Sequence, residues 1–218
     1  DYYVKHFIAL ILNLLSPTKI TNFVFKKQNN LLITMLVTTV GCFLYFAFGS
    51  NLLKERLHLA NPTATFVSTG RLKDYKLNFG LWGENVTTRW HGGVGTIEYS
   101  PGAEVWGVIW SLNNEDLANL DSQEGVKDGF YTPLTVSVET DKGPVVCRTY
   151  QMNNFYATVA SPQYKEVVCL GAVQNNLPDE YVTRLKAVQT NNYTGPSLRD
   201  QIMVPSSENC TSLTSEIN

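Results

Sequence analysis

Cysteine and histidine are scarce in this 218-residue sequence, which contains four and three of them respectively. The cysteines form no C-x-x-C pair, lie far from one another and have no histidine cluster beside them: Cys42, Cys147, Cys169 and Cys210. Zinc sites use closely spaced ligands, and small secreted domains use dense cysteine frameworks. The sequence therefore predicts neither a metal site nor a disulfide framework, and it favours a reducing, cytoplasmic compartment.

Charge is also limited and evenly balanced. Seventeen basic and nineteen acidic residues give a formal net charge of -2, and the basic residues form no stripe along the chain. A protein that binds nucleic acid usually carries a clustered positive surface. We therefore expect no nucleic-acid partner. The length and the 44% hydrophobic content suit one globular domain with an extra segment attached.

The first 42 residues differ from the rest of the chain. Residues 31–48 are apolar and long enough to span a bilayer as one helix, which needs about 18–20 residues. However, the run contains three threonines and a glycine, and its last third has the aromatic content of a strand. We expect residues 1–42 to be a leader outside the domain, either an artefact of the gene start or, as the weaker alternative, a membrane anchor. The domain is expected over residues 43–204, followed by a loose polar tail at 205–218.

A glycine-containing loop follows the first strand-like segment. Residues 43–48 are aromatic and apolar, Gly49-Ser50-Asn51 comes next, and the leucines of residues 52–59 have helical spacing. This pattern predicts a strand, a tight loop and a helix. Glycine opens backbone conformations closed to other residues, and consecutive amides at a helix start can bind a carboxylate, a phosphate or a developing oxyanion. The alternative is a simple polar turn.

The remaining elements are mostly strands. Alternating or continuous apolar patterns predict six of them, at residues 63–69, 71–79, 95–99, 104–112, 130–139 and 145–152. The glycine-rich stretch 80–95 matches neither a dinucleotide-binding nor a Walker loop. His91 within it could transfer protons, but a lone loop histidine is more often structural. Further helices are expected from Ser161-Pro162 and from Pro178.

Glu124 is the unusual residue of a helix predicted over residues 113–125. Asn113 can cap its start and Gly125 can end it. A carboxylate at a helix C-terminus opposes the helix dipole, so its pKa rises if water is excluded, and such a group can act as a general acid–base near neutral pH. The alternative is that Glu124 points into solvent.

Five motifs in order carry a resemblance to a known family. The segments 46–52 (FAFGSNL), 90–93 (WHGG), 104–108 (EVWGV), 120–126 (LDSQEGV) and 161–164 (SPQY) resemble those of the γ-glutamylcyclotransferases, most closely the animal cytosolic members. The resemblance extends from about Cys42 to Ile202. It implies an α+β fold, a small mixed β-barrel with flanking helices.

The resemblance also implies an activity and a site. Members cyclise γ-glutamyl-amino acids to 5-oxoproline and release the amino acid, use no metal or cofactor, and often form homodimers. Glu124 would be the catalytic acid–base, and Tyr131 and Tyr164 would line the site. The γ-glutamyl group would be held by the loop residues Tyr45, Phe46, Ala47, Phe48, Gly49, Ser50 and Asn51. The chain departs from the family at Phe48, where members usually have tyrosine.

Two alternatives to this function stay open. A sister cyclotransferase acting on γ-glutamylamines or on glutathione would share the loop and the glutamate. A catalytically silent module would keep the fold and bind a γ-glutamyl metabolite or a protein. Retention of Glu124 favours an enzyme, of the lyase or acyltransferase type, whereas Phe48 favours the silent module.

Overall fold

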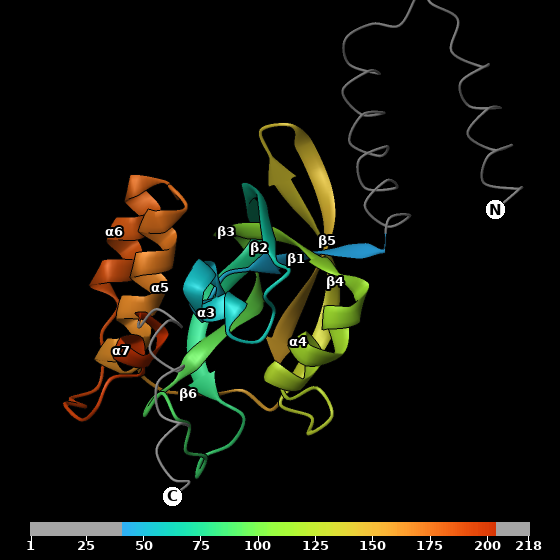
Figure 1. The fold of residues 1–218 in the computed structure, drawn as a ribbon. Helices are drawn as coiled ribbons and strands as arrows, with labels where there is room; N and C mark the ends of the chain where they lie inside the picture. Colours follow the sequence, from blue (N-terminus) through green and yellow to red (C-terminus); the bar gives the residue numbers. More distant parts are fainter. Residues whose placement is uncertain (1–40, 204–218) are drawn as a thin grey trace, which may run out of the picture.

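The structure is a computed structural model and describes residues 41–203 (Figure 1). The leader and tail expected at residues 1–42 and 205–218 thus lie outside the described residues, apart from positions 41 and 42. The first strand begins at Cys42, one residue before the expected start of the domain. Within the described part, no helix combines the length and the hydropathy that crossing a membrane requires.

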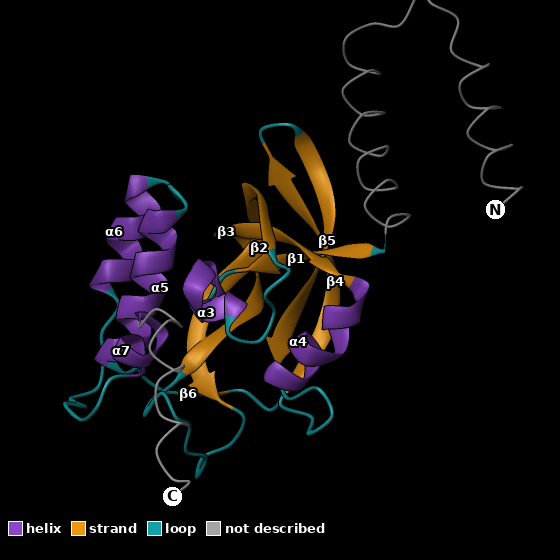
Figure 2. Ribbon diagram, in the orientation of Figure 1, coloured by secondary structure: helices purple, strands orange, loops and turns teal. Residues whose placement is uncertain are grey.

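Five strands close into a small mixed barrel. Neighbouring strands pair in the order β3-β1-β5-β4-β2, and β2 pairs again with β3 to close the ring. The β1–β5 pair is parallel and the other pairs are antiparallel. The strands are β1 (Cys42–Ala47), β2 (Thr65–Leu81), β3 (Val94–Asn113), β4 (Tyr131–Thr140) and β5 (Gly143–Met152), and a short β6 (Tyr156–Ala157) extends β2. The expected small mixed β-barrel with flanking helices is confirmed (Figure 2).

Two expected strand pairs are in fact two long strands. The sequence predicted breaks near residue 70 and at residues 100–103, but β2 and β3 each continue through these points. The β2–β3 pairing is irregular at one of these points, because its register shifts between Lys73 and Tyr75. Asp74 takes a positive φ of 61° there, and its Oδ1 accepts a hydrogen bond of 2.9 Å from the amide of Gly102. The strands bend at this bulge without ending.

Two apolar clusters divide the core. One receives residues from all five barrel strands and therefore fills the barrel: Leu44, Phe46, Phe48, Leu72, Ile97, Val105, Ile109, Val136, Val138 and Cys147. The other packs the outer face of the sheet against the helices and includes Tyr45 and Ala47. Because side chains alternate along a strand, β1 contributes to both clusters.

The helices lie on the outside of the barrel. In Figure 1, α5, α6 and α7 form one group beside the barrel and α4 lies on another side, next to β4. The helical segments are η1 (Ser50–Leu52), α3 (Lys54–His58), η2 (Asn114–Asp116), α4 (Leu117–Gln123), α5 (Pro162–Gln174), α6 (Asp179–Ala187) and α7 (Leu198–Met203). The sequence did not predict β6 or α7.

Two helix starts differ from expectation. The helix expected over residues 52–59 is split, because Leu53 is extended (φ -77°, ψ 121°) between η1 and α3. The helix expected over 113–125 begins with the 3-10 turn η2, and the side chain of Asn113 does not cap it. Instead, Asn113 Oδ1 accepts a hydrogen bond from Cys42 Sγ at 3.4 Å. The helix expected from Ser161-Pro162 is α5, and Ser161 caps it, since its Oγ accepts a hydrogen bond of 3.2 Å from the Tyr164 amide.

Candidate active site

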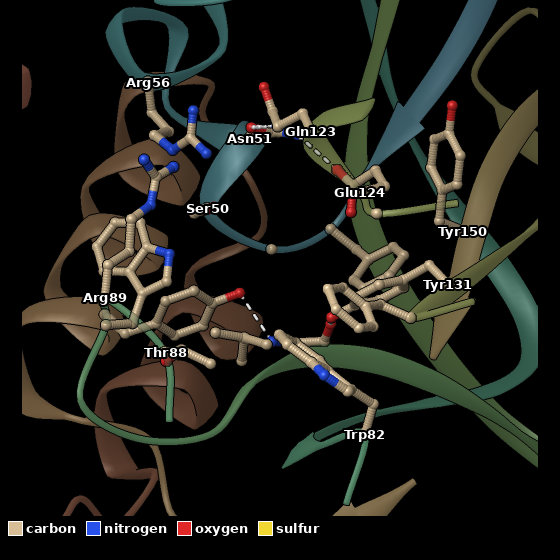
Figure 3. A pocket seen from close by; sticks show the side chains of 18 of the residues that line it. Ser50, Asn51, Arg56, Trp82, Thr88, Arg89, Gln123, Glu124, Tyr131 and Tyr150 are labelled. Atoms are coloured by element: carbon tan, nitrogen blue, oxygen red, sulfur yellow. Dashed lines mark hydrogen bonds between the residues drawn. The ribbon is translucent and has the colours of Figure 1, made fainter. Parts of the chain in front are cut away.

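One cavity of about 290 Å³ lies where the β1–η1 loop faces the end of α4 (Figure 3). This volume suits a small metabolite. Its walls come from the loop, the segment between β2 and β3, the end of α4 and helix α5. The lining residues are Tyr45, Phe48, Gly49, Ser50, Asn51, Arg56, Trp82, Thr88, Arg89, Trp90, Val94, Gly95, Ser122, Gln123, Glu124, Gly125, Asp128, Phe130, Tyr131, Tyr150 and Tyr164.

Glu124 sits at the C-cap of α4 and faces this cavity. Gly125, which follows it, takes the left-handed φ of 63° that ends the helix and turns the chain away. Glu124 Oε1 accepts a hydrogen bond of 3.2 Å from Asn51 Nδ2. The carboxyl is thus held against the β1–η1 loop, as Figure 3 shows. The sequence-based alternative, a Glu124 pointing into solvent, is wrong.

Asn51 organises the site through four hydrogen bonds. Its side-chain amide also reaches the hydroxyl of Tyr45 at 3.1 Å, and its Oδ1 accepts a bond of 3.1 Å from Gln123. Its backbone carbonyl accepts a bond of 3.1 Å from the indole of Trp110. Because Asn51 is buried and so fully bonded, its position fixes both the loop and the carboxyl it contacts.

The environment of Glu124 changes its acidity. Burial raises the pKa of the carboxyl from its usual value to about 7. The charge of Arg56 and hydrogen bonding by Gln123 and Asn51 lower the pKa, but they offset only part of the effect of burial. A carboxyl with a pKa near neutrality can both accept and return a proton under physiological conditions.

Two tyrosines anchor the opposite wall at Gly95. The Tyr164 hydroxyl accepts a hydrogen bond of 2.8 Å from the Gly95 amide, and the Tyr131 hydroxyl donates one of 2.8 Å to the Gly95 carbonyl. Burial raises the pKa of both phenols, that of Tyr164 to about 12, so both are neutral at pH 7. They therefore shape the wall without adding charge to it.

Most residues predicted from the sequence meet in this cavity. Tyr45, Phe48, Gly49, Ser50, Asn51, Glu124, Tyr131 and Tyr164 all line it. Phe46 and Ala47 do not. Phe46 alternates to the opposite face of β1 and fills the barrel, and Ala47 is fully buried in the core between barrel and helices. The two-residue period of a strand accounts for Phe46, whereas Ala47 shares the face of Tyr45 and is covered by the core.

Gly49 brings the loop close to α5. Its φ of -109° is not left-handed, and its ψ is -138°. A Cβ at this position would lie 3.0 Å from the Tyr164 hydroxyl. Glycine thus permits close approach between the loop and α5.

Several lining residues were not predicted from the sequence. Arg56 lies five positions after the loop, and this closeness in the sequence was the one feature that could have marked it as a site residue. Trp82 and Arg89 come from the stretch between β2 and β3, and Trp82 stacks on Phe130 with ring centroids 4.2 Å apart. Only the closed barrel brings these segments to Glu124.

Asp121, on α4, is held by three hydrogen bonds. Arg148 donates two hydrogen bonds to its carboxylate, at 2.7 and 2.9 Å, and the hydroxyl of Tyr150 donates a third at 2.5 Å. Tyr150 lines the cavity and packs edge-on against Tyr45 at 5.9 Å. Asp121 therefore supports one wall of the site.

Comparison with known proteins finds one family, similar proteins from cow and human, and a similar solved structure. The AIG2-like family matches residues 104–185. The bovine gamma-glutamylcyclotransferase is 53% identical over 154 residues, which are 70% of this chain and 82% of that protein, and the human one is 52% identical over the same shares. The chain belongs to the gamma-glutamylcyclotransferase family. A solved structure called gamma-glutamyl cyclotransferase agrees, with 49% identity, a TM-score of 0.71 and coverage of 74% of this chain and 98% of that one.

These similarities confirm the family resemblance read from the five motifs. They also confirm that the chain is an enzyme of the gamma-glutamylcyclotransferase class.

Proposed function

We propose that this gamma-glutamylcyclotransferase family member converts γ-glutamyl-amino acids into 5-oxoproline and the free amino acid. The observation that carries the proposal is the placement of Glu124, whose pKa is raised to about 7, in the cavity beside the Gly49–Asn51 loop. This arrangement supplies a proton acceptor and backbone amides around a space of metabolite size. By the same family resemblance, we propose that the enzyme forms homodimers, is cytoplasmic and has its catalytic domain over residues 43–204.

The reaction is an intramolecular amide exchange. The α-amine of the glutamyl group attacks its own γ-carbonyl carbon, a new C–N bond closes the five-membered ring, and the bond to the leaving amino acid breaks. Ionised Glu124 takes a proton from the attacking nitrogen and delivers it to the departing amine, so the enzyme is unchanged after each turnover. Holding the chain curled favours the ring closure, because well-oriented intramolecular reactions have very high effective molarities.

The oxyanion formed in this reaction needs stabilisation. We assign it to the amides of Gly49, Ser50 and Asn51, because one donor of this kind contributes about 2.7–4 kcal/mol in well-studied enzymes. The helical turn η1 has only three residues, so a helix dipole adds little. The loop amides themselves carry the role. Ser50 is not required as a nucleophile, and the scheme uses no metal or cofactor.

The leaving amino acid needs a different part of the cavity. We place its side chain beside the stacked rings of Trp82 and Phe130, which are half-buried and form an apolar wall. Such a wall can bind apolar side chains of several shapes.

Product analysis tests this function. The full chain is incubated separately with γ-glutamyl-alanine, a γ-glutamylamine and glutathione, and 5-oxoproline is quantified. We expect the dipeptide to be converted fastest. Preferential conversion of glutathione or of the amine would replace this substrate class by one of the two sister activities. If no 5-oxoproline forms from any of them, but the ligands bind, the chain is a silent binding module.

The acidity of Glu124 predicts the pH dependence. The mechanism needs the ionised carboxylate, so kcat/KM should fall as pH decreases through about 7, the pKa of this group. Two pH units below that value, it should be about 100-fold lower than its plateau, because each unit of pH protonates ten times more of the base. A pH–rate profile on γ-glutamyl-alanine measures this. A midpoint near the ordinary value for glutamate would contradict the assignment of Glu124 as a desolvated base.

Asn51 should influence both rate and pH profile. Asn51→Ala removes the amide that holds Glu124 and Tyr45, so we expect kcat to fall by roughly 10-fold or more, as for loss of a hydrogen bond to a charged group. Because that bond lowers the pKa of Glu124, its loss should also move the midpoint of the profile to higher pH. The exposed Asn114 provides the control, since Asn114→Ala should change neither. An unchanged midpoint in Asn51→Ala would show that the bond does not tune the carboxyl.

A further inference from the structure

Arg56 is a buried cation that forms no ion pair within residues 41–203, although the charge of Glu124 acts on it. Its side chain leaves α3 and lines the cavity, the residue is only 5% exposed, and its Nε is buried without a hydrogen bond. No ion pair involves Arg56 in residues 41–203. A buried charge is costly unless an opposite charge and hydrogen bonds compensate it. The position of Arg56 therefore favours the binding of an anionic group of a ligand.

Arg89 places a second positive charge beside the first. It lies on the exposed stretch between β2 and β3 and lines the same cavity, and in Figure 3 the two guanidinium groups point toward one another. It too has no ion-pair partner among the residues described. Burial lowers the pKa of Arg56, and the charge of Arg89 is the next cause. Two cations that repel each other in one cavity are stabilised when an anion binds between them.

We infer that Arg56 and Arg89 together form the subsite for the α-carboxylate of the γ-glutamyl group. A planar carboxylate is the anion that guanidinium groups bind best, through pairs of parallel hydrogen bonds. This inference rests on the proposed function, and it identifies what recognises the acid half of the substrate.

The choice of this carboxylate follows from the position of Glu124. The α-amine and the α-carboxylate are attached to the same carbon, and the amine must reach Glu124 to lose its proton. Arg56 lies close enough to Glu124 for each charge to act on the other. A carboxylate next to the amine therefore lies within reach of Arg56, and Arg89 lines the same cavity beside it. The other lining carboxyl, Asp128, is exposed at the rim, where water screens its charge.

A truncated substrate isolates this contact. 4-Aminobutyryl-alanine lacks the α-carboxylate but keeps the attacking amine, so the same bond changes yield 2-pyrrolidone and alanine. Its kcat/KM is compared with that of γ-glutamyl-alanine in the wild-type enzyme and in the variants Arg56→Lys and Arg89→Gln. Arg56→Lys retains the charge and loses the planar fork, and Arg89→Gln changes an exposed side chain. Arg184→Gln on α6 is the control, because Arg184 is exposed and lies outside the cavity.

The ratio of the two kcat/KM values is the readout, since a purely structural role would lower both rates together. We expect the wild-type enzyme to prefer the glutamyl substrate by about 100-fold or more, and each cavity variant to reduce that preference by about 10-fold, as for loss of a hydrogen bond between charged groups. Arg184→Gln should keep the wild-type preference. Thermal unfolding of Arg56→Lys checks that the fold is retained.

Different failures have different meanings. If the wild-type enzyme forms no 5-oxoproline, the proposed function itself is wrong. If it does, but both cavity variants keep the full preference, the arginine subsite is wrong and the function stands. If the variants instead lose discrimination between γ-glutamyl-alanine and γ-glutamyl-ethylamine, the arginines bind the carboxylate of the leaving residue, which also overturns the inference.

Discussion

Replacing Glu124 by glutamine is expected to lower kcat with γ-glutamyl-alanine by about 10²–10⁴, the range typical of a general acid–base. The glutamine keeps the shape of the side chain and can still contact Asn51, but it cannot accept the proton of the attacking amine. Substrate should therefore still bind, and the loss should fall on kcat and on kcat/KM together. Steady-state kinetics and a separate binding measurement on the same preparation test this.

The control for this variant must be chosen from the structure. Asp116 is buried and accepts a hydrogen bond from Thr63, and Asp121 holds Arg148 and Tyr150, so neutralising either would disturb the fold or the cavity wall. Glu115 lies in η2, the turn that precedes α4, and is exposed. Glu115→Gln should retain nearly full turnover. Near-normal turnover in Glu124→Gln, with unchanged folding, would remove Glu124 from the mechanism.

Substitution of Gly171 should have the largest effect on stability. Helix α5 passes so close to the loop that a Cβ at Gly171 would overlap the backbone nitrogen of Leu53 and lie 2.6 Å from the carbonyl carbon of Leu52. Backbone atoms cannot move aside as a flexible side chain can. We expect Gly171→Val to lower the free energy of unfolding by about 1–3 kcal/mol, the usual cost of overpacking. Because α5 also carries Tyr164, turnover should fall as well.

Chemical denaturation measures the first effect and 5-oxoproline release the second. Val173 is exposed on the same helix, so Val173→Ala should change the free energy of unfolding by less than about 0.5 kcal/mol. If Gly171→Val has the stability of the wild type, the space between α5 and the loop is larger than in the structure.

The strands and the position of Glu124 could be predicted because they depend on neighbours in the sequence. Alternation of apolar residues marks strands, and Gly125 after a helical pattern marks the C-cap at which Glu124 lies. The split of the predicted helix 52–59 could not be predicted. It depends on α5, whose close contact with Leu52 and Leu53 joins residues more than a hundred positions apart.

The same limit applies to the site. Tyr131 and Tyr164 entered the prediction only through the family resemblance, since nothing local shows that both hydroxyls meet at Gly95. Arg56 and Arg89 were missed because an arginine in a polar helix or loop resembles any solvated arginine. Their lack of ion-pair partners becomes visible only when the barrel has brought every described carboxylate into place.

The most direct test of the central claim, intramolecular cyclisation, is the fate of solvent oxygen. Wild-type enzyme is incubated with γ-glutamyl-alanine in water enriched in oxygen-18, and the products are analysed by mass spectrometry. Attack by the substrate's own amine predicts unlabelled 5-oxoproline and alanine in equal amounts, because no water enters the new bond. Glutamate carrying oxygen-18 in its γ-carboxylate would show that water is the nucleophile and would contradict the account.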